Sequence, residues 1–238
     1  MQDAVYVGGL HRVVGPLPYG DGVGLSFRAE QVSLNRPVGL RILSLEGRDA
    51  ASLARARAAM AAVSKIDATS CLRVLDYGAI DATSWYVASE LANGATLAQE
   101  LSAGTLTPDR ALAWAHGAAC ALADLHTRGL ANGGLSSSAL VTSRGAGEPT
   151  ERVRLADAGI ASVLGTPSPT EDVVALVALL GELADAVGVA GVGRRLATLA
   201  DCCVDAEEPS EVAAMLGAVR RAESSVPPPL TDLRASER

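Results

Sequence analysis

The chain has 238 residues, of which 49% are hydrophobic and 20% charged, and its formal net charge is -7. This length and apolar content suffice for one sizeable core or two small lobes and exclude a disordered chain. The negative charge argues against nucleic acid as the main partner.

The sequence also predicts a cytoplasmic location. It contains no apolar stretch of about 18 residues free of charge, the length that a membrane span needs. Its N-terminus lacks the basic and apolar regions of a signal peptide. The four cysteines show no metal-type spacing, which indicates core thiols in a reducing compartment.

The first part of the chain predicts β structure interrupted by one helix. Short apolar runs alternate with turn residues over residues 5–45. Residues 50–65 are rich in alanine, with apolar side chains at helical spacing, and predict a helix. Two further strands are expected at residues 72–75 and 85–91. The pattern therefore gives five β segments with one inserted helix.

The remainder predicts mostly helices. A short helix is expected at residues 96–101, and a longer one should begin after Thr107, with Pro108 at its first position, and end at Gly129. Short strands are expected at residues 140–142 and 153–155, followed by helices at 172–187, 193–204 and 211–222. Pattern alone indicates an α+β fold.

Residues 125–141 read LHTRGLANGGLSSSALV. This segment resembles the catalytic loop of bacterial Ser/Thr protein kinases, whose apolar frame it shares. The polar positions differ, because Asn132, Gly133 and Gly134 stand where His-Arg-Asp is usual, and Ala139 replaces the metal-binding Asn. A phosphoryl transferase needs a carboxylate to orient its acceptor hydroxyl. The resemblance thus implies a kinase fold from which the catalytic residues have been lost.

The segment LPYGDGVG at residues 17–24 occupies the place of the glycine-rich loop that covers ATP phosphates in this family. The resemblance makes Gly20, Gly22 and Gly24 candidate nucleotide-binding residues, and an ordinary hairpin turn is the alternative. Arg41 stands at the position of the phosphate-binding lysine. It either contacts phosphate, forms an internal salt bridge or fills a vacant nucleotide site.

Two further positions bear on nucleotide binding. The predicted helix over residues 50–63 contains no acidic residue, so the Lys–Glu ion pair that marks an active kinase cannot form in the usual way. Glu90 lies at the expected hinge between the lobes and completes the candidate nucleotide-binding set. The resemblance therefore implies no required cofactor, with weak binding of ATP and Mg²⁺ as the alternative.

Asp157 and Gly159 match the Asp-Phe-Gly segment, which makes Asp157 the candidate metal ligand. Capping of the local turn by the Asp157 side chain is the alternative. Ala139 would leave such a metal without one ligand. Only 15 positions separate Asp157 from Asp172, so the activation segment is truncated and the peptide-docking loop is missing.

The expected architecture is a two-lobed, protein-kinase-like α+β fold with a reduced C-terminal lobe. Its parts are a β-rich lobe at residues 1–92, a helical lobe at 93–223 and a Pro-rich tail at 224–238. Thr166, Thr170 and Thr231 lie in Pro-rich stretches and are candidate phosphorylation sites.

The function predicted from these features is that of a catalytically inactive pseudokinase, acting as a signalling or scaffold module for protein interaction. Its partner would be an active Ser/Thr kinase or a phosphothreonine-binding domain, and not nucleic acid. Two alternatives stay open. One is a nucleotide-binding switch, and the other is an atypical Ser/Thr kinase that uses Asp157 and a divalent metal.

Overall fold

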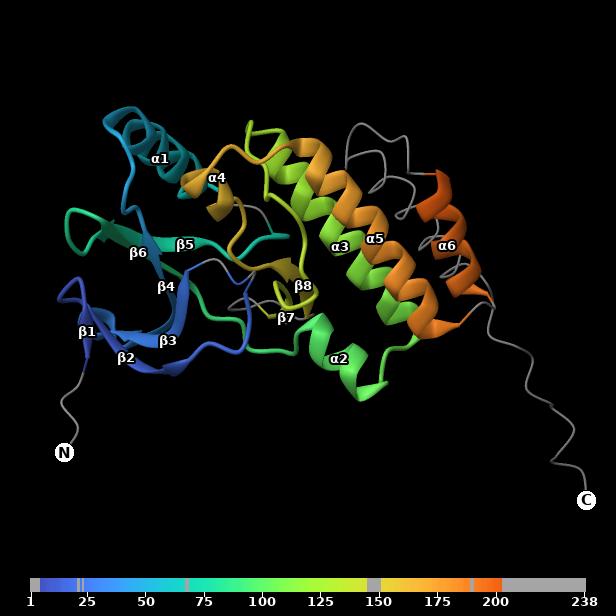
Figure 1. Ribbon diagram of the computed structural model, residues 1–238. Coiled ribbons are helices and arrows are strands. Elements are labelled where there is room, and N and C mark those ends of the chain that lie inside the picture. The colour runs from blue at the N-terminus through green and yellow to red at the C-terminus, as the bar shows by residue number, and fades with distance from the viewer. Residues whose placement is uncertain are drawn as a thin grey trace, which may run out of the picture.

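The computed structural model describes residues 5–20, 22, 24–66, 69–144, 151–188 and 191–202. The helix expected at 211–222, the Pro-rich tail and Thr231 lie outside the described residues. Within them, a β-rich part with one long helix is followed by a mostly helical part (Figure 1). No helix in these ranges is long and apolar enough to span a membrane.

The β-rich part is a six-stranded antiparallel sheet with the order β1-β2-β3-β4-β6-β5. Its strands are β1 (Tyr6–Val7), β2 (His11–Pro16), β3 (Leu25–Gln31), β4 (Arg36–Ser44), β5 (Val74–Ala79) and β6 (Ser84–Glu90). The prediction of five β segments was one short, because β1 adds a two-residue edge strand. The prediction for β5 was also displaced, since its pairing with β6 runs from Val74 to Ala79.

A 3-10 helix, η1 (Val32–Leu34), connects β3 to β4, and helix α1 (Ala50–Val63) connects β4 to β5. The carboxylate of Asp49 accepts a hydrogen bond of 2.7 Å from the Ser52 amide and caps α1. The buried face of α1 packs on the main apolar core and lies beside α4 (Ile160–Leu164). The expected inserted helix is therefore present.

The helical part contains α2 (Leu97–Ala103), α3 (Pro108–His126), α4, α5 (Pro169–Val187) and α6 (Val192–Cys202). Helices α3 and α5 run side by side, and a hairpin of β7 (Leu140–Ser143) and β8 (Arg152–Leu155) packs against α3 (Figure 1). Helix α5 starts at Pro169, three residues before the predicted start at Asp172, because Ser168 supplies the cap. The five-residue helix α4 was not predicted.

Two apolar clusters pack around the junction where the candidate site lies. The larger one joins α1, α3, α5 and α6 with the inner ends of the strands. A small cluster of Tyr19, Leu72, Val141 and Ala156 bridges the sheet and the β7–β8 hairpin. The junction between the two parts is thus filled by side chains, among them Tyr19 from the loop after β2.

Candidate functional site

Three of the predicted site residues meet at the junction between the sheet and the helical part. Arg41 on β4 forms an ion pair with Asp157, which follows β8. Their side chains are only 3% and 8% exposed. Gly20 lies against both, because a Cβ at this position would collide with the Arg41 guanidinium and the Asp157 carboxylate. Glycine therefore allows the loop backbone to approach the pair closely.

The loop that carries Gly20 is also tied to the segment that resembles a catalytic loop. The Gly20 amide donates a hydrogen bond of 3.0 Å to the Ser138 carbonyl. Gly24 is equally close to the neighbouring strand, where a Cβ would collide with the Ile42 carbonyl. Both glycines have positive φ, 135° for Gly20 and 73° for Gly24, and Gly22 has φ 82°. These contacts place the described part of the loop after β2 directly against the Arg41–Asp157 pair and the adjoining strand.

Tyr19 is a site residue that sequence reasoning missed. Its side chain is buried, and its hydroxyl accepts a hydrogen bond of 3.0 Å from the Ala92 amide in the segment that connects the two parts. The pKa of Tyr19 is raised to about 12, chiefly by burial; the Asp157 carboxylate also raises this pKa, whereas the hydrogen bond from the Ala92 amide and the charge of Arg41 lower it. The one signal in the sequence was an aromatic residue placed directly before Gly20.

Little free space remains in this cleft. The cavity beside Arg41 and Asp157 has a volume of about 10 Å³. That is room for about one water molecule, whereas pockets for small ligands usually enclose about 300–1,000 Å³. The cleft, as its described residues are arranged, does not fit a nucleotide.

The same residues do not fit a divalent metal. The Asp157 carboxylate is engaged by Arg41, and Ala139 presents only a buried methyl group. No cluster of three or more His, Cys, Asp or Glu side chains that could hold a metal ion occurs within the described ranges. Asp157 has φ 58°, a left-handed conformation that is uncommon outside glycine. Its partner in the structure is thus a cation from the protein itself.

Glu90 does not join this group. Its carboxylate accepts a hydrogen bond of 2.9 Å from Arg154 and lies 3.5 Å from the Arg73 guanidinium. Both contacts belong to a separate pocket behind the connection between the two parts. The structure therefore brings Gly20, Arg41 and Asp157 together and places the Glu90 side chain elsewhere.

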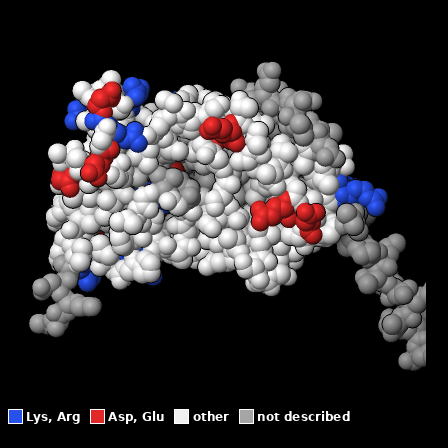
Figure 2. Space-filling view, in the orientation of Figure 1, with Lys and Arg blue, Asp and Glu red and all other residues white. Residues whose placement is uncertain are grey.

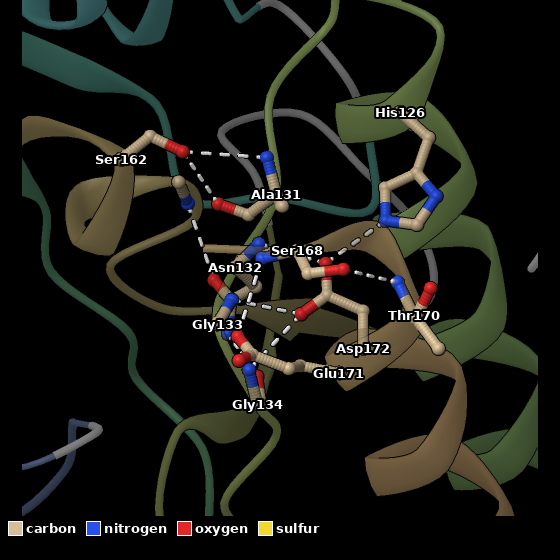
Figure 3. Close-up of polar contacts among 11 residues, drawn as sticks. His126, Ala131, Asn132, Gly133, Gly134, Ser162, Ser168, Thr170, Glu171 and Asp172 are labelled. Carbon is tan, nitrogen blue, oxygen red and sulfur yellow. Dashed lines mark hydrogen bonds and ion pairs between the residues drawn. The ribbon is translucent and has the colours of Figure 1, made fainter. Parts of the chain in front are cut away.

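A second set of polar contacts fixes the segment that resembles a catalytic loop (Figure 3). Asp172 in α5 is fully buried, and its carboxylate accepts hydrogen bonds from the amides of Asn132 (2.8 Å), Gly133 (2.8 Å) and Gly134 (3.0 Å). Its Oδ2 also lies 2.9 Å from Nε2 of His126. The Asp172 carboxylate is thus engaged by the loop backbone and His126. Gly133 and Gly134 have no side chain that could supply another carboxylate.

Asn132 links this loop to the Asp157 segment. Its side-chain oxygen accepts a hydrogen bond of 3.2 Å from the Gly159 amide, and its side-chain nitrogen donates one of 2.5 Å to the Gly134 carbonyl. Gly133 and Gly134 have φ values of 77° and 118°, which side chains rarely adopt. The glycines are therefore suited to the backbone path of the loop, and the polar contacts hold the path in place.

The two candidate phosphorylation sites that the structure describes are exposed. Thr166 precedes α5, and Thr170 lies in its first turn, where its amide donates a hydrogen bond of 3.2 Å to the Ser168 hydroxyl. Figure 2 shows Asp and Glu side chains over the helical part, Lys and Arg beside α6, and side chains of both charges over α1. Both threonines are accessible to a modifying enzyme.

Comparison with known proteins identifies relatives among the kinases. The chain is 29% identical over 180 residues to serine/threonine-protein kinase pkn2 of Myxococcus xanthus. That match covers 75% of this chain but spans only 21% of the length of the relative. No protein-family model matches the chain.

Solved structures show the same fold. The kinase domain of Mycobacterium tuberculosis PknI superposes with a TM-score of 0.67 at 19% identity, covering 92% of this chain and 99% of that domain. A double mutant of that domain gives a TM-score of 0.69 at 20% identity with the same coverage. The expected protein-kinase-like fold and its α+β architecture are confirmed.

Proposed function

We propose that this chain, which has a protein-kinase-like fold and is related to the bacterial Ser/Thr kinases, is a catalytically inactive module that acts by binding a protein partner. The observation that carries the proposal is that the side chains of Tyr19, Arg41 and Asp157 occupy the place where kinases bind nucleotide, with the Gly20 backbone lying against the ion pair. The cytoplasm is its proposed location.

The proposal follows from what a nucleotide would have to displace. In protein kinases a lysine contacts the phosphates and the Asp of Asp-Phe-Gly holds Mg²⁺. Here the two equivalent groups neutralise each other, so a nucleotide with Mg²⁺ would have to separate this buried ion pair before it could contact either group. Nucleotide entry would also remove the Tyr19 hydroxyl from the Ala92 amide.

The acceptor side supports the same conclusion. Gly134 stands where a kinase has its acceptor-orienting aspartate, and the Asp172 carboxylate is already bound by three backbone amides. The connection between α4 and α5 is too short to form a peptide-docking loop, since α5 begins five residues after α4 ends. Phosphoryl transfer depends on positioning of the acceptor and on stabilisation of the transition-state charge, and loss of the groups for both should abolish it.

A protein partner is supported by the exposed surface. Acidic side chains lie on the surface over the helical part (Figure 2), and Val174 on α5 is 64% exposed. Thr166 and Thr170 flank this helix start, where added phosphate groups would create a new anionic contact. An active Ser/Thr kinase or a phosphothreonine-binding domain is the partner class that we propose.

A nucleotide-dependent switch is the second candidate, and one observation favours it. Two of the groups that close the cleft, Tyr19 and Gly20, lie on one loop, and that loop reaches the connecting segment and the catalytic-loop segment through the 3.0 Å hydrogen bonds to Ala92 and Ser138. Because these hydrogen bonds join the loop to two other segments of the cleft, a ligand that competes for the same groups could displace the loop.

Thermal unfolding with ATP or ADP, with and without Mg²⁺ or Mn²⁺, separates these functions. A nucleotide at roughly 1 mM registers any Kd below about 0.1 mM. We expect no shift for the parent protein and a shift for Tyr19→Ala only if removal of the ring opens the cleft. Tyr6→Ala is the matched control, because Tyr6 is 53% exposed. Metal-dependent ATP binding by the parent, or phosphoryl transfer that Asp157→Asn abolishes, would overturn the proposal.

A further inference from the structure

A pocket of about 240 Å³ lies behind the connection between the sheet and the helical part. Four arginines from separate segments line it. Arg36 begins β4 and Arg73 precedes β5, whereas Arg144 follows β7 and Arg154 lies on β8. Glu90 is the one acidic side chain in the described lining. Both parts of the molecule therefore contribute cations to one small volume.

The charge of this pocket is opposite to that of the chain. Four guanidinium groups and one carboxylate give the described lining a charge of +3 (4 − 1), while the whole chain carries -7. Arginine stays protonated in proteins, so this charge cannot be relieved by loss of a proton. A concentration of like charge at one point raises the local concentration of an oppositely charged ligand.

Glu90 is the acidic side chain in the described lining, and Arg36 donates a hydrogen bond of 2.6 Å to the uncharged side chain of Gln31. The Glu90 carboxylate contacts Arg154 at 2.9 Å and Arg73 at 3.5 Å. The Arg154 side chain is 8% exposed and is therefore held where solvent screens it poorly. Arg73 is 52% exposed, so its guanidinium lies at the mouth of the pocket and is reachable from solvent. The pocket thus combines a buried cation with exposed ones.

We propose that this pocket binds a phosphate monoester, carried by a phosphorylated side chain or by a small metabolite. A phosphate dianion matches the excess charge more closely than a single carboxylate does. The planar fork of arginine binds phosphate oxygens through two parallel hydrogen bonds. The volume is below the roughly 300–1,000 Å³ of pockets for drug-sized ligands, which suits a headgroup of this size.

An anion in this pocket would also connect the two parts of the molecule. Arg36 and Arg73 lie in the β-rich part, whereas Arg154 lies on β8 and Arg144 directly follows β7 in the helical part. A ligand that bonds to both pairs stabilises their relative position by mass action. This inference is independent of the proposed function, because the pocket shares no residue with the filled cleft.

Isothermal titration calorimetry with three probes tests the proposal: inorganic phosphate, N-acetyl-phosphothreonine amide and N-acetyl-threonine amide, at constant ionic strength. We expect the full chain to bind phosphothreonine at least tenfold more tightly than threonine. Binding of inorganic phosphate as well would indicate a site for any small phosphate. Binding of the amino-acid probe alone would indicate a site for phosphorylated side chains.

The variants Arg36→Gln and Arg144→Gln should each weaken phosphothreonine binding about tenfold. Arg57→Gln is the matched control, because Arg57 is exposed on α1, away from the pocket, and its loss should leave binding unchanged. Far-UV circular dichroism of each variant verifies the fold. Equal binding of threonine and phosphothreonine, no binding of either phosphate probe, or equal weakening by Arg57→Gln would overturn the proposal.

Discussion

Replacing Arg41 by methionine tests whether the Arg41–Asp157 pair holds the cleft closed. The two side chains are 3% and 8% exposed, so removing the guanidinium leaves a buried carboxylate without this partner. Breaking a buried pair in this way costs about 3–5 kcal/mol of unfolding free energy. For a domain of this size the loss lowers Tm by roughly 10 °C. Urea denaturation and thermal unfolding of Arg41→Met at neutral pH measure both quantities.

Two further variants, a control at Arg12 and the double variant Arg41→Met/Asp157→Asn, show whether the loss of stability comes from the buried pair. Arg12 and Glu30 also form an ion pair in the sheet, but their side chains are 46% and 23% exposed, so Arg12→Met should leave the unfolding free energy nearly unchanged. Adding Asp157→Asn to Arg41→Met removes the stranded charge and should recover about 2 kcal/mol. A loss below about 1 kcal/mol in Arg41→Met would refute the structural role of the pair.

Three further predictions concern the catalytic-loop segment at residues 132–134, which Asp172 binds, and the buried ring of Tyr19. Asp172→Ala removes a charged acceptor shared by three amides, each bond being worth about 1.5–3 kcal/mol, so amide hydrogen exchange at residues 132–134 should accelerate strongly. Gly134→Asp must adopt φ 118°, a strain of about 1–3 kcal/mol, and should gain no phosphoryl transfer in a radiolabel assay; any gain contradicts the proposed inactivity. The pKa of Tyr19 is about 12 against an ordinary 10.0, so as pH rises the unfolded chain loses this proton first. The stability that Tyr19 contributes is therefore complete below pH 10.0 and lost between about pH 10 and 12, and denaturation of Tyr19→Phe should lack that part of the pH dependence.

The α+β class and most of the elements were predictable because local signals and apolar periodicity agreed, whereas the two-lobed, kinase-like architecture was predicted from the family resemblance. Thr107 and Pro108 placed the start of α3 correctly, and the Thr107 hydroxyl does accept a hydrogen bond from the Arg110 amide at 3.4 Å. The start of α5 was predicted late, although Ser168 and Pro169 carry the same type of signal. The helix α4 escaped prediction because five residues are too few to show a helical period.

The state of the cleft was not predictable from local pattern. The three alternatives for Arg41 could not be separated by sequence, because its partner Asp157 lies 116 positions away. Tyr19 was missed for the same reason, since the amide that it meets belongs to Ala92, 73 positions away. Contacts of this range depend on how the loop after β2 folds back over the junction, and no local propensity encodes that path.

The retention of Asp157 has a physical explanation that needs no metal. A carboxylate that is 8% exposed requires a counter-charge, and in an active kinase a metal ion supplies it. Ala139 removes one ligand of such a metal, so the charge must come from elsewhere. Arg41 supplies it, and Arg41 at 3% exposure requires an anion in turn. Since loss of either residue removes a counter-charge from the other, the pair can contribute to stability whether or not a nucleotide binds. An aspartate at this position is therefore compatible with a structural role as well as with a catalytic one.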